Sequence, residues 1–279
     1  MKPSRAYLAV WFGLLYWIFS VAGCLAPDSL LQRGNTAFQR KEWERARQYY
    51  ERALEHGSTR EAAAYNLGLT YFEQGEFQKS LEMFDAIPAV EVRQPMLGVY
   101  QARAAAELGL DERAEREFRS SLTVHPNLGE THLYFAYFLE SRGRLSEAVE
   151  EMEVALRFND LREQAILEAA AYRRRLNEPA RAAALLEQLL TTHGDRYQHY
   201  VKLGHALLEI GEDARAEDFL RRGLGFNPGE PEGLYLLGVA LQRQGKVELA
   251  RELFTALDQK KQGEWGEKAA LRLAELSPP

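Results

Sequence analysis

A small residue recurs every 34 positions along most of this 279-residue chain. The first series is Gly34, Gly68, Ala102, Ala136, Ala170, Gly204 and Gly238. A second series follows twelve positions later, at Ala46, Ser80, Ala114, Ala148, Ala182, Ala216 and Ala250. A fixed period of this length without insertions indicates one structural repeat copied along a solenoid, rather than a chain folded around a single core. Solenoids of this kind mostly bind other molecules.

Each 34-residue repeat has the pattern of two amphipathic helices joined by a turn. Counted from Pro27, apolar or small residues fall at positions 4, 7, 8 and 11, the stripe of a helix that buries one face. Position 15 is Gly in five repeats and Asn177 in a sixth, which suits a turn residue with positive φ. Lys41 occupies this position in the first repeat, so we expect its turn to differ. Small residues at positions 8 and 20 predict a close crossing of the paired helices.

These motifs resemble the tetratricopeptide repeat. The clearest copy spans residues 61–94, with Leu67, Gly68 and Tyr71 on its first helix and Ser80 and Phe84 on its second. The resemblance implies an all-α, right-handed solenoid of seven helix pairs, at 27–60, 61–94, 95–128, 129–162, 163–196, 197–230 and 231–264. Residues 265–279 read as a capping helix and tail, with Trp265, Ala269, Leu273 and Leu276 available to cover the last pair.

Two repeats depart from the pattern. The third has Gly98 and Gln101 where the family prefers large apolar residues, and the fifth has Arg173 at position 11. We expect locally weaker packing that the neighbouring repeats compensate. A flexible joint is the alternative.

Residues 1–23 have the organisation of a bacterial lipoprotein signal peptide. Lys2 and Arg5 precede an uncharged apolar stretch, and Val21-Ala22-Gly23-Cys24 resembles a lipobox that uses the only cysteine of the chain. This predicts lipidation at Cys24, followed by a short tether at 24–26. An uncleaved signal anchor is the alternative, because the uncharged stretch is long enough to span a bilayer.

Both alternatives place the repeats in the bacterial cell envelope, outside the cytoplasm. If Cys24 becomes the first residue, the next residue is Leu25 rather than the aspartate that resembles a signal for inner-membrane retention. We therefore expect a lipid-anchored protein of the outer membrane that faces the periplasm, or, with a signal anchor, an inner-membrane protein with extracytoplasmic repeats.

Charge and motifs exclude several function classes. The formal net charge is −6, and removing residues 1–23 with Lys2 and Arg5 leaves −8, so nucleic acid is not an expected partner. We expect the Arg173-Arg174-Arg175 run to be solvated helix surface. The sequence contains no glycine-rich phosphate loop, nucleophile elbow or zinc-binding HExxH, and the six histidines form no metal-binding pair on one helix face. We therefore expect no enzyme, cofactor, metal or small-molecule substrate.

Repeat geometry predicts a protein-binding groove, because first helices line the concave face of such solenoids. The predicted groove residues are Leu31, Asn35, Phe38, Tyr65, Leu69, Phe72, Val99, Arg103, Tyr137, Glu140, Arg174, Leu208, Tyr235 and Arg243. Apolar anchors flanked by charges suit an extended segment or an amphipathic helix of another protein. The carboxylate clamp of the family is excluded: Asn35 and Asn66 occupy its asparagine positions, but its cationic positions hold Leu31, Met96 and Tyr100.

Two functions remain open. The first is a membrane-anchored scaffold that assists assembly of an envelope complex, resembling the repeat lipoproteins of pilus secretins, Tad-type pili or outer-membrane barrel assembly. The second is an adaptor that recruits or regulates a periplasmic enzyme such as a peptidoglycan hydrolase.

Overall fold

The computed structural model describes residues 27–88, 94–192, 194, 196–260 and 263–276. These residues form fifteen α-helices, one short 3-10 helix and no strands. The helices are α2 (Pro27–Gln39), α3 (Trp43–Leu54), α4 (Arg60–Glu73), α5 (Phe77–Asp85), α6 (Leu97–Glu107), α7 (Asp111–Val124), α8 (Gly129–Ser141), α9 (Leu145–Ala155), η2 (Asn159–Leu161), α10 (Arg162–Arg175), α11 (Pro179–Thr192), α12 (Tyr197–Glu209), α13 (Asp213–Phe226), α14 (Pro231–Arg243), α15 (Val247–Gln259) and α16 (Gly263–Leu276). None of these helices is long and apolar enough to cross a membrane. The predicted signal peptide, lipobox and tether lie outside the described residues.

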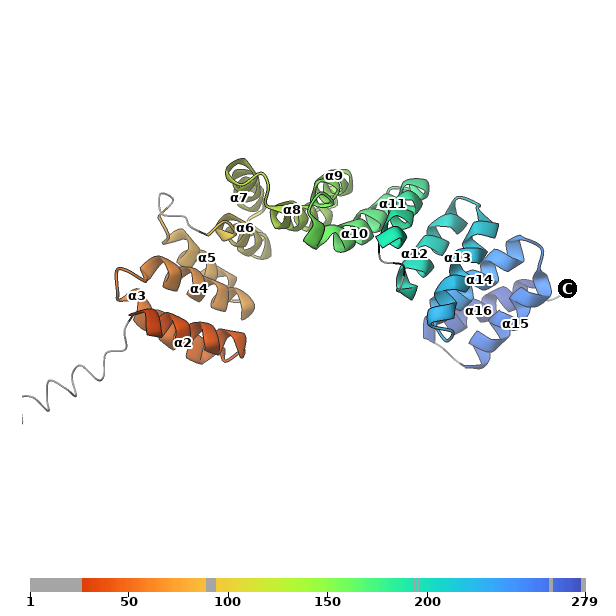
Figure 1. Ribbon diagram of the computed structural model, residues 1–279, viewed down its shortest axis with the longest axis horizontal. Coiled ribbons are helices and arrows are strands. Elements are labelled where there is room, and N and C mark those ends of the chain that lie inside the picture. Colours follow the sequence, from red (N-terminus) through yellow and green to blue (C-terminus); the bar gives the residue numbers. More distant parts are fainter. Residues whose placement is uncertain (1–26, 89–93, 193, 195, 261–262, 277–279) are drawn as a thin grey trace, which may run out of the picture. The chain divides into compact units, whose positions relative to one another are not determined.

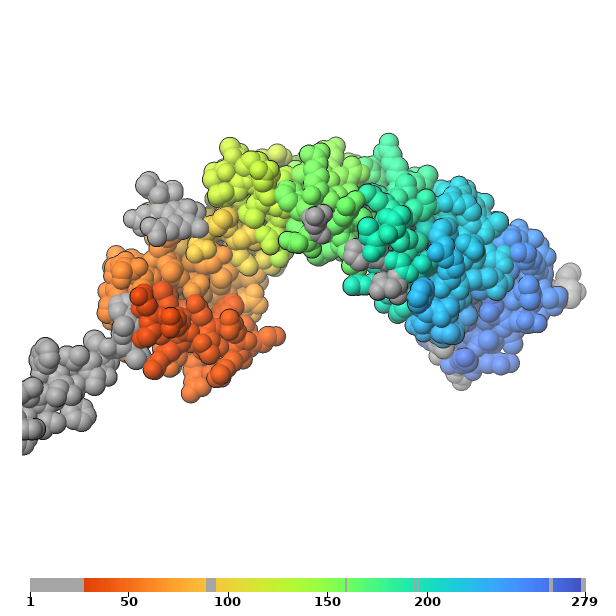
Figure 2. Space-filling view, in the orientation of Figure 1, coloured from red at the N-terminus to blue at the C-terminus, as the bar shows by residue number. Residues whose placement is uncertain are grey.

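Consecutive helices pack as pairs, α2 with α3, α4 with α5, α6 with α7, α10 with α11, α12 with α13 and α14 with α15, and α16 packs on α15 (Figure 1). In the pair of α8 and α9, His132 Nδ1 lies 2.7 Å from Glu151 Oε2. The predicted all-α solenoid of seven helix pairs with a last covering helix is therefore the fold. The described residues divide into two compact bodies, an N-terminal body that ends at Thr131 and a C-terminal body that begins at His132. In the C-terminal body one apolar core runs from Ile166 in α10 to Ala269 in α16, and side chains fill the spaces between its ribbons (Figure 2).

The turn inside each helix pair contains one residue with a left-handed backbone conformation, always at position 15 of the repeat. Positive φ occurs at Gly75, Gly109, Gly143, Asn177, Gly211 and Gly245, each 34 residues after the last. Lys41 has φ 59°, so the expectation that the first turn differs is wrong. The backbone geometry of this turn is imposed by the packing of the two helices, and the lysine adopts it in spite of its Cβ.

The small residues at position 8 make room for the second helix of the same pair. A Cβ added to Gly68 would lie 2.5 Å from the ring of Phe84, and the hydroxyl of Ser80 donates to the Gly68 carbonyl at 2.8 Å. Gly238 and Phe254 repeat this contact, also at 2.5 Å. The helices therefore cross closely at positions 8 and 20, as predicted.

Two expectations about irregular repeats need correction. Arg173 and Arg174 are not solvated helix surface, since each is partly buried and forms an ion pair with another helix. Arg175 is exposed as expected, and it also pairs with Glu140 of α8. Arg173 is largely buried and bridges Glu153 of α9 and Glu178 of the following turn. Packing at Gly98 is not compensated completely by its neighbours, because a pocket lined by residues of α6 and α7 remains beside it.

Helix α16 covers the end of the last pair. It begins at Gly263, two residues before the expected start, and buries Gly266 and Ala269. The Trp265 ring lies 5.4 Å from that of Tyr235 in α14, while Leu273 and Leu276 pack on the same core.

Candidate protein-binding face

The first helices of successive pairs contact one another directly, α2 with α4 and α4 with α6 in the N-terminal body. We call the surface formed by these three helices the first-helix face. Its hollow is a cavity of about 340 Å³ lined by Asn35, Phe38, Gln39, Tyr50, Asn66 and Leu69. Three of these residues, Asn35, Phe38 and Leu69, are among the predicted groove residues.

A pair of asparagine amides lies in this cavity. The Asn35 Oδ1 atom accepts two hydrogen bonds, from the Tyr50 hydroxyl at 2.8 Å and from Asn66 Nδ2 at 2.9 Å. Burial raises the pKa of Tyr50 far above its ordinary value, so this hydroxyl stays protonated and donates. Within the described part of the chain, Asn35 Nδ2 and Asn66 Oδ1 have no hydrogen-bond partner. One amide donor and one amide acceptor are therefore available side by side.

Aromatic side chains continue the first-helix face beyond the amide pair. The ring of Phe72 in α4 lies 5.6 Å from that of Tyr100 in α6, in an edge-to-face arrangement. The Arg103 guanidinium lies over both rings, 4.6 Å from the Phe72 centroid and 5.2 Å from that of Tyr100. Such a cluster offers apolar contact area together with a cation held by aromatic faces.

Other predicted groove residues of this body are committed to packing. Val99 is fully buried, and Tyr65 is 9% exposed between the rings of Phe84 and Tyr100. Burial raises the pKa of Tyr65 to about 12. Leu31 is half-buried and packs on the core of the first two pairs. None of these three offers more than part of its side chain to a partner.

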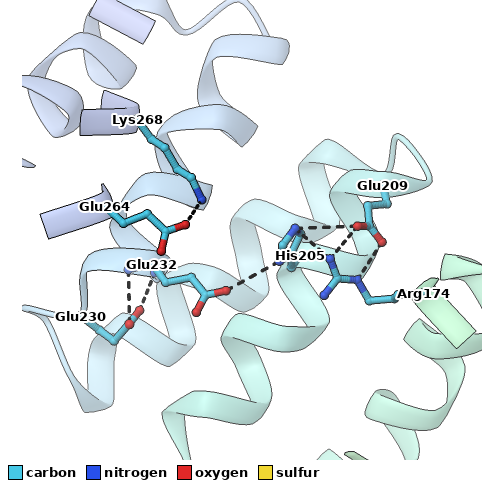
Figure 3. A network of polar contacts seen from close by, with 8 residues as sticks. Arg174, His205, Glu209, Glu230, Glu232, Glu264 and Lys268 are labelled. Carbon is cyan, nitrogen blue, oxygen red and sulfur yellow. Dashed lines mark hydrogen bonds and ion pairs between the residues drawn. The ribbon is translucent and has the colours of Figure 1, made fainter. Parts of the chain in front are cut away.

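In the C-terminal body the corresponding positions are occupied by contacts within the chain. The Arg174 guanidinium forms a two-pronged ion pair with Glu209 at 2.6 and 2.8 Å (Figure 3). The Arg175 side chain pairs with Glu140, and Arg243 Nη1 donates to the Leu208 carbonyl at 2.5 Å. Each of these contacts joins residues 35 positions apart, from one first helix to the next.

Further contacts complete this polar surface. His205 Nε2 lies 2.9 Å from Arg174 Nη2, and His205 Nδ1 lies 3.7 Å from Glu232 of α14 (Figure 3). The Arg174 hydrogen bond and charge lower the pKa of Glu209, and the His205 hydrogen bond lowers that of Glu232. Both carboxylates are thus held in their charged form. The charged groove residues predicted in this body, Glu140, Arg174 and Arg243, instead connect neighbouring helices.

The remaining predicted residues of this body are also engaged. The Tyr137 hydroxyl accepts a hydrogen bond from Gln164 at 2.7 Å, and Leu208 is 4% exposed. Tyr235 is partly covered by Trp265 of α16. In the described residues no group of three or more His, Cys, Asp or Glu side chains could hold a metal ion.

Sequence reasoning missed two contributors to the cavity. Gln39 follows Phe38 at the end of α2, and Tyr50 belongs to position 24, which the repeat pattern assigns to packing alone. The sequence indicates Asn66 only as an asparagine position of the carboxylate clamp, not as part of the predicted groove. The 15-residue separation of Tyr50 and Asn35 and the 31-residue separation of Asn66 and Asn35 become contacts only when α2, α3 and α4 are packed.

Comparison with known proteins agrees with this architecture. Tetratricopeptide repeat models match residues 31–91, 167–231 and 232–260. The general transcriptional corepressor trfA of Dictyostelium discoideum is 26% identical over 127 residues, which is 45% of this chain and 9% of that protein. The chain therefore spans less than a tenth of that relative's length.

Several solved structures share the fold at low identity. The C-terminal part of a TPR repeat-containing protein from Cytophaga hutchinsonii has a TM-score of 0.70 at 12% identity, covering 86% of this chain and 98% of that one. The pilF protein of Pseudomonas aeruginosa has a TM-score of 0.55 at 14% identity, with coverages of 76% and 97%. PilW, a type IV pilus biogenesis factor, has a TM-score of 0.55 at 15% identity, with coverages of 75% and 98%.

Proteins built from these repeats are generally non-catalytic scaffolds that bind other proteins. The 34-residue register, the seven helix pairs and the repeat models all agree, and this chain belongs to the tetratricopeptide repeat family.

Proposed function

We propose that this protein is a membrane-anchored scaffold that binds an extended segment of an envelope-assembly protein on the first-helix face of its N-terminal body. The amide pair carries the proposal. An extended segment presents unsatisfied main-chain N–H and C=O groups, which match Asn66 Oδ1 and Asn35 Nδ2, whereas the main chain of a helix is satisfied internally. Apolar side chains of the segment then contact Phe38, Leu69 and Phe72.

The contrast between the two bodies supports this location. Arg174, Glu209 and Glu140 of the C-terminal body already have partners, and a ligand that replaced them would break ion pairs within the chain. The amide pair of the N-terminal body offers hydrogen bonds without such a loss. Binding there leaves the packing of the helices intact.

Site-specific crosslinking tests the surface. A photoreactive benzoyl-phenylalanine at position 72 of the full chain, in its own bacterium, should capture one protein, which mass spectrometry identifies. Phe226 is the matched control, because it is 55% exposed on α13, a second helix. Asn66→Leu should reduce capture at position 72 several-fold with little change in Tm. Equal capture at positions 72 and 226, or none at 72, would show that the first-helix face is not the binding surface.

The identity of the captured protein tests the pathway. A pilus, secretin or barrel-assembly component supports the assembly role, in keeping with the described role of PilW as a type IV pilus biogenesis factor. A peptidoglycan hydrolase would support the adaptor function instead.

The proposed anchor is lipid at Cys24, on the outer membrane and facing the periplasm. Since α2 begins at Pro27, only Leu25 and Ala26 would separate a lipidated Cys24 from the first helix. At about 3.3 Å per extended residue, the first pair would then lie close to the lipid surface. Radioactive fatty acid should label the full chain and not the Cys24→Ala variant. Label that survives the substitution rules out lipidation at this residue, and membrane retention of the unlabelled variant would indicate a signal anchor.

A further inference from the structure

A second pocket lies in the N-terminal body, between α6, α7 and Ile87, which follows α5. Its volume is about 320 Å³. Leu97, Ser121 and Ile87, each at most 7% exposed, form its floor, while Pro95 and Val124 lie on an exposed rim. The pocket is separate from the cavity that holds Asn35 and Asn66, since the two share no lining residue.

The pocket exists because two facing positions of the third repeat are both small. Gly98, at position 4 of the repeat, faces Ser121 at position 27, and a Cβ added to Gly98 would lie 3.3 Å from the Ser121 Cβ. The sixth repeat has Tyr200 and Gly223 at these positions, and a Cβ on Gly223 would lie 2.8 Å from the Tyr200 Cβ. There a large ring compensates for the glycine opposite. No such ring is present in the third repeat.

The residues that surround the Tyr200 ring in the sixth repeat correspond to residues that line the pocket in the third. Its ring lies 6.4 Å from that of Phe219 and 5.7 Å from that of Phe226, and the Arg222 guanidinium lies 5.1 Å from its centroid. With Gly223, these residues occupy positions 23, 26, 27 and 30 of the sixth repeat. The residues 102 positions earlier, three repeats back, are Glu117, Ser120, Ser121 and Val124. All four line the pocket. The pocket therefore occupies the space that the Tyr200 ring, at position 4, fills in the sixth repeat.

We propose that this pocket binds one aromatic ring of tyrosine size, supplied as a side chain of a bound protein segment. A cavity of about 150 Å³ is already enough for benzene, so a phenol ring fits with room to spare. Ser120, Ser121 and His125 give the pocket polar partners that suit a phenolic hydroxyl more than a plain phenyl ring. The exposed Val124 and Pro95 on the rim offer apolar contact to residues beside the inserted tyrosine.

Binding of two probes to the full chain tests the proposal. Blocked Gly-Tyr-Gly represents a tyrosine within a protein segment, and p-cresol represents the free side chain. Saturation-transfer NMR should show both probes bound to the wild-type chain. Gly98→Tyr should fill the pocket from within, abolish binding of both probes and raise Tm by about 2 to 4 °C.

Control variants distinguish a loss of binding caused by filling the pocket from a loss caused by misfolding. Gly225→Tyr adds the same ring on α13, where an added Cβ meets open space, and should leave probe binding unchanged. Ser121→Leu fills the pocket from α7 and should also abolish binding, which keeps the test valid if Gly98→Tyr folds poorly by circular dichroism. Failure of both probes to bind the wild type, or equal binding to the filled variants, would overturn the proposal. Binding of p-cresol without the peptide would overturn a protein segment as the source of the ring.

Discussion

Lys41 has a backbone conformation that every other repeat gives to glycine or asparagine. Its φ of 59° brings Cβ close to the neighbouring carbonyl oxygen, which costs about 1 kcal/mol relative to glycine. The same turn at Gly75 and Asn177 shows that the conformation belongs to the helix pair and not to the residue. The first repeat therefore forms its turn at an energetic cost.

We predict that Lys41→Gly stabilises the protein. Removing the Cβ relieves the left-handed strain and should raise the free energy of unfolding of the N-terminal body by about 1 kcal/mol, and Tm by about 2 to 4 °C. Thermal unfolding followed by circular dichroism measures the change. Arg40→Gly is the control: its φ is not positive, so it gains only chain flexibility and should not raise Tm. A lower Tm for Lys41→Gly would contradict the strain argument.

At the scale of helices, ion pairs add polar contacts between elements that also share the apolar core. Glu217 of α13 accepts hydrogen bonds from Lys246 Nζ at 2.6 Å, Gln244 Nε2 at 2.9 Å and Arg221 Nε at 2.9 Å. Two of these donors lie in the turn between α14 and α15. The hydrogen bond from Lys246, with those from Arg221 and Gln244, lowers the pKa of Glu217 from 4.5 to about 2.

This shift predicts an acid-sensitive contact. Because the folded pKa lies below the unfolded one, the stabilisation is present above pH 4.5 and is lost as the pH falls towards 2. Glu217→Gln should therefore lower Tm at pH 7, by an amount that shrinks as the pH falls through this range. Calorimetry between pH 7 and 3 measures the trend. Glu252→Gln, on the exposed surface of α15, is the control. A deficit that does not depend on pH would show that Glu217 acts through packing alone.

At the scale of the whole molecule, α16 covers the last helix pair. Continuing the register past Glu264 places Leu271 and Arg272 at positions 7 and 8. Position 8 is Gly or Ala in all seven repeats, because the second helix of the pair crosses there. The Arg272 side chain at this position leaves no room for a second helix to cross α16. Leu271 is accordingly 68% exposed. The other face of α16 covers the core through Ala269, Leu273 and Leu276.

Removal of this helix should expose the end of the core. A chain that stops at Lys260 uncovers Tyr235 and Phe254, and should show a lower Tm and concentration-dependent association in light scattering. Leu271→Gln in the intact chain is the control. Because this side chain already faces solvent, the substitution should change neither Tm nor association. If the shortened chain stayed monomeric with an unchanged Tm, α16 would not act as a cap.

Much of the fold could be predicted from the sequence, because the residues that determine each helix pair lie within one repeat. Small residues at positions 8 and 20, a stripe at 4, 7 and 11, and glycine at 15 act within about 30 residues, so their spacing alone indicates the helix pair. The seven pairs and the covering helix follow from this register. The predicted groove was harder to locate, because the same register cannot separate an exposed position-5 residue from one, such as Val99, that the next repeat buries.

The tertiary structure decided what happens where side chains of different repeats meet. It paired Arg174 with Glu209 and Arg175 with Glu140, joined Asn35 to Asn66, and left a pocket opposite Gly98. Each outcome depends on the distance between residues on separate helices, which local periodicity does not contain. The sequence by itself determined the repeated unit, because the forces within a pair are local. Which surfaces stay open for binding depends on how those pairs pack against one another.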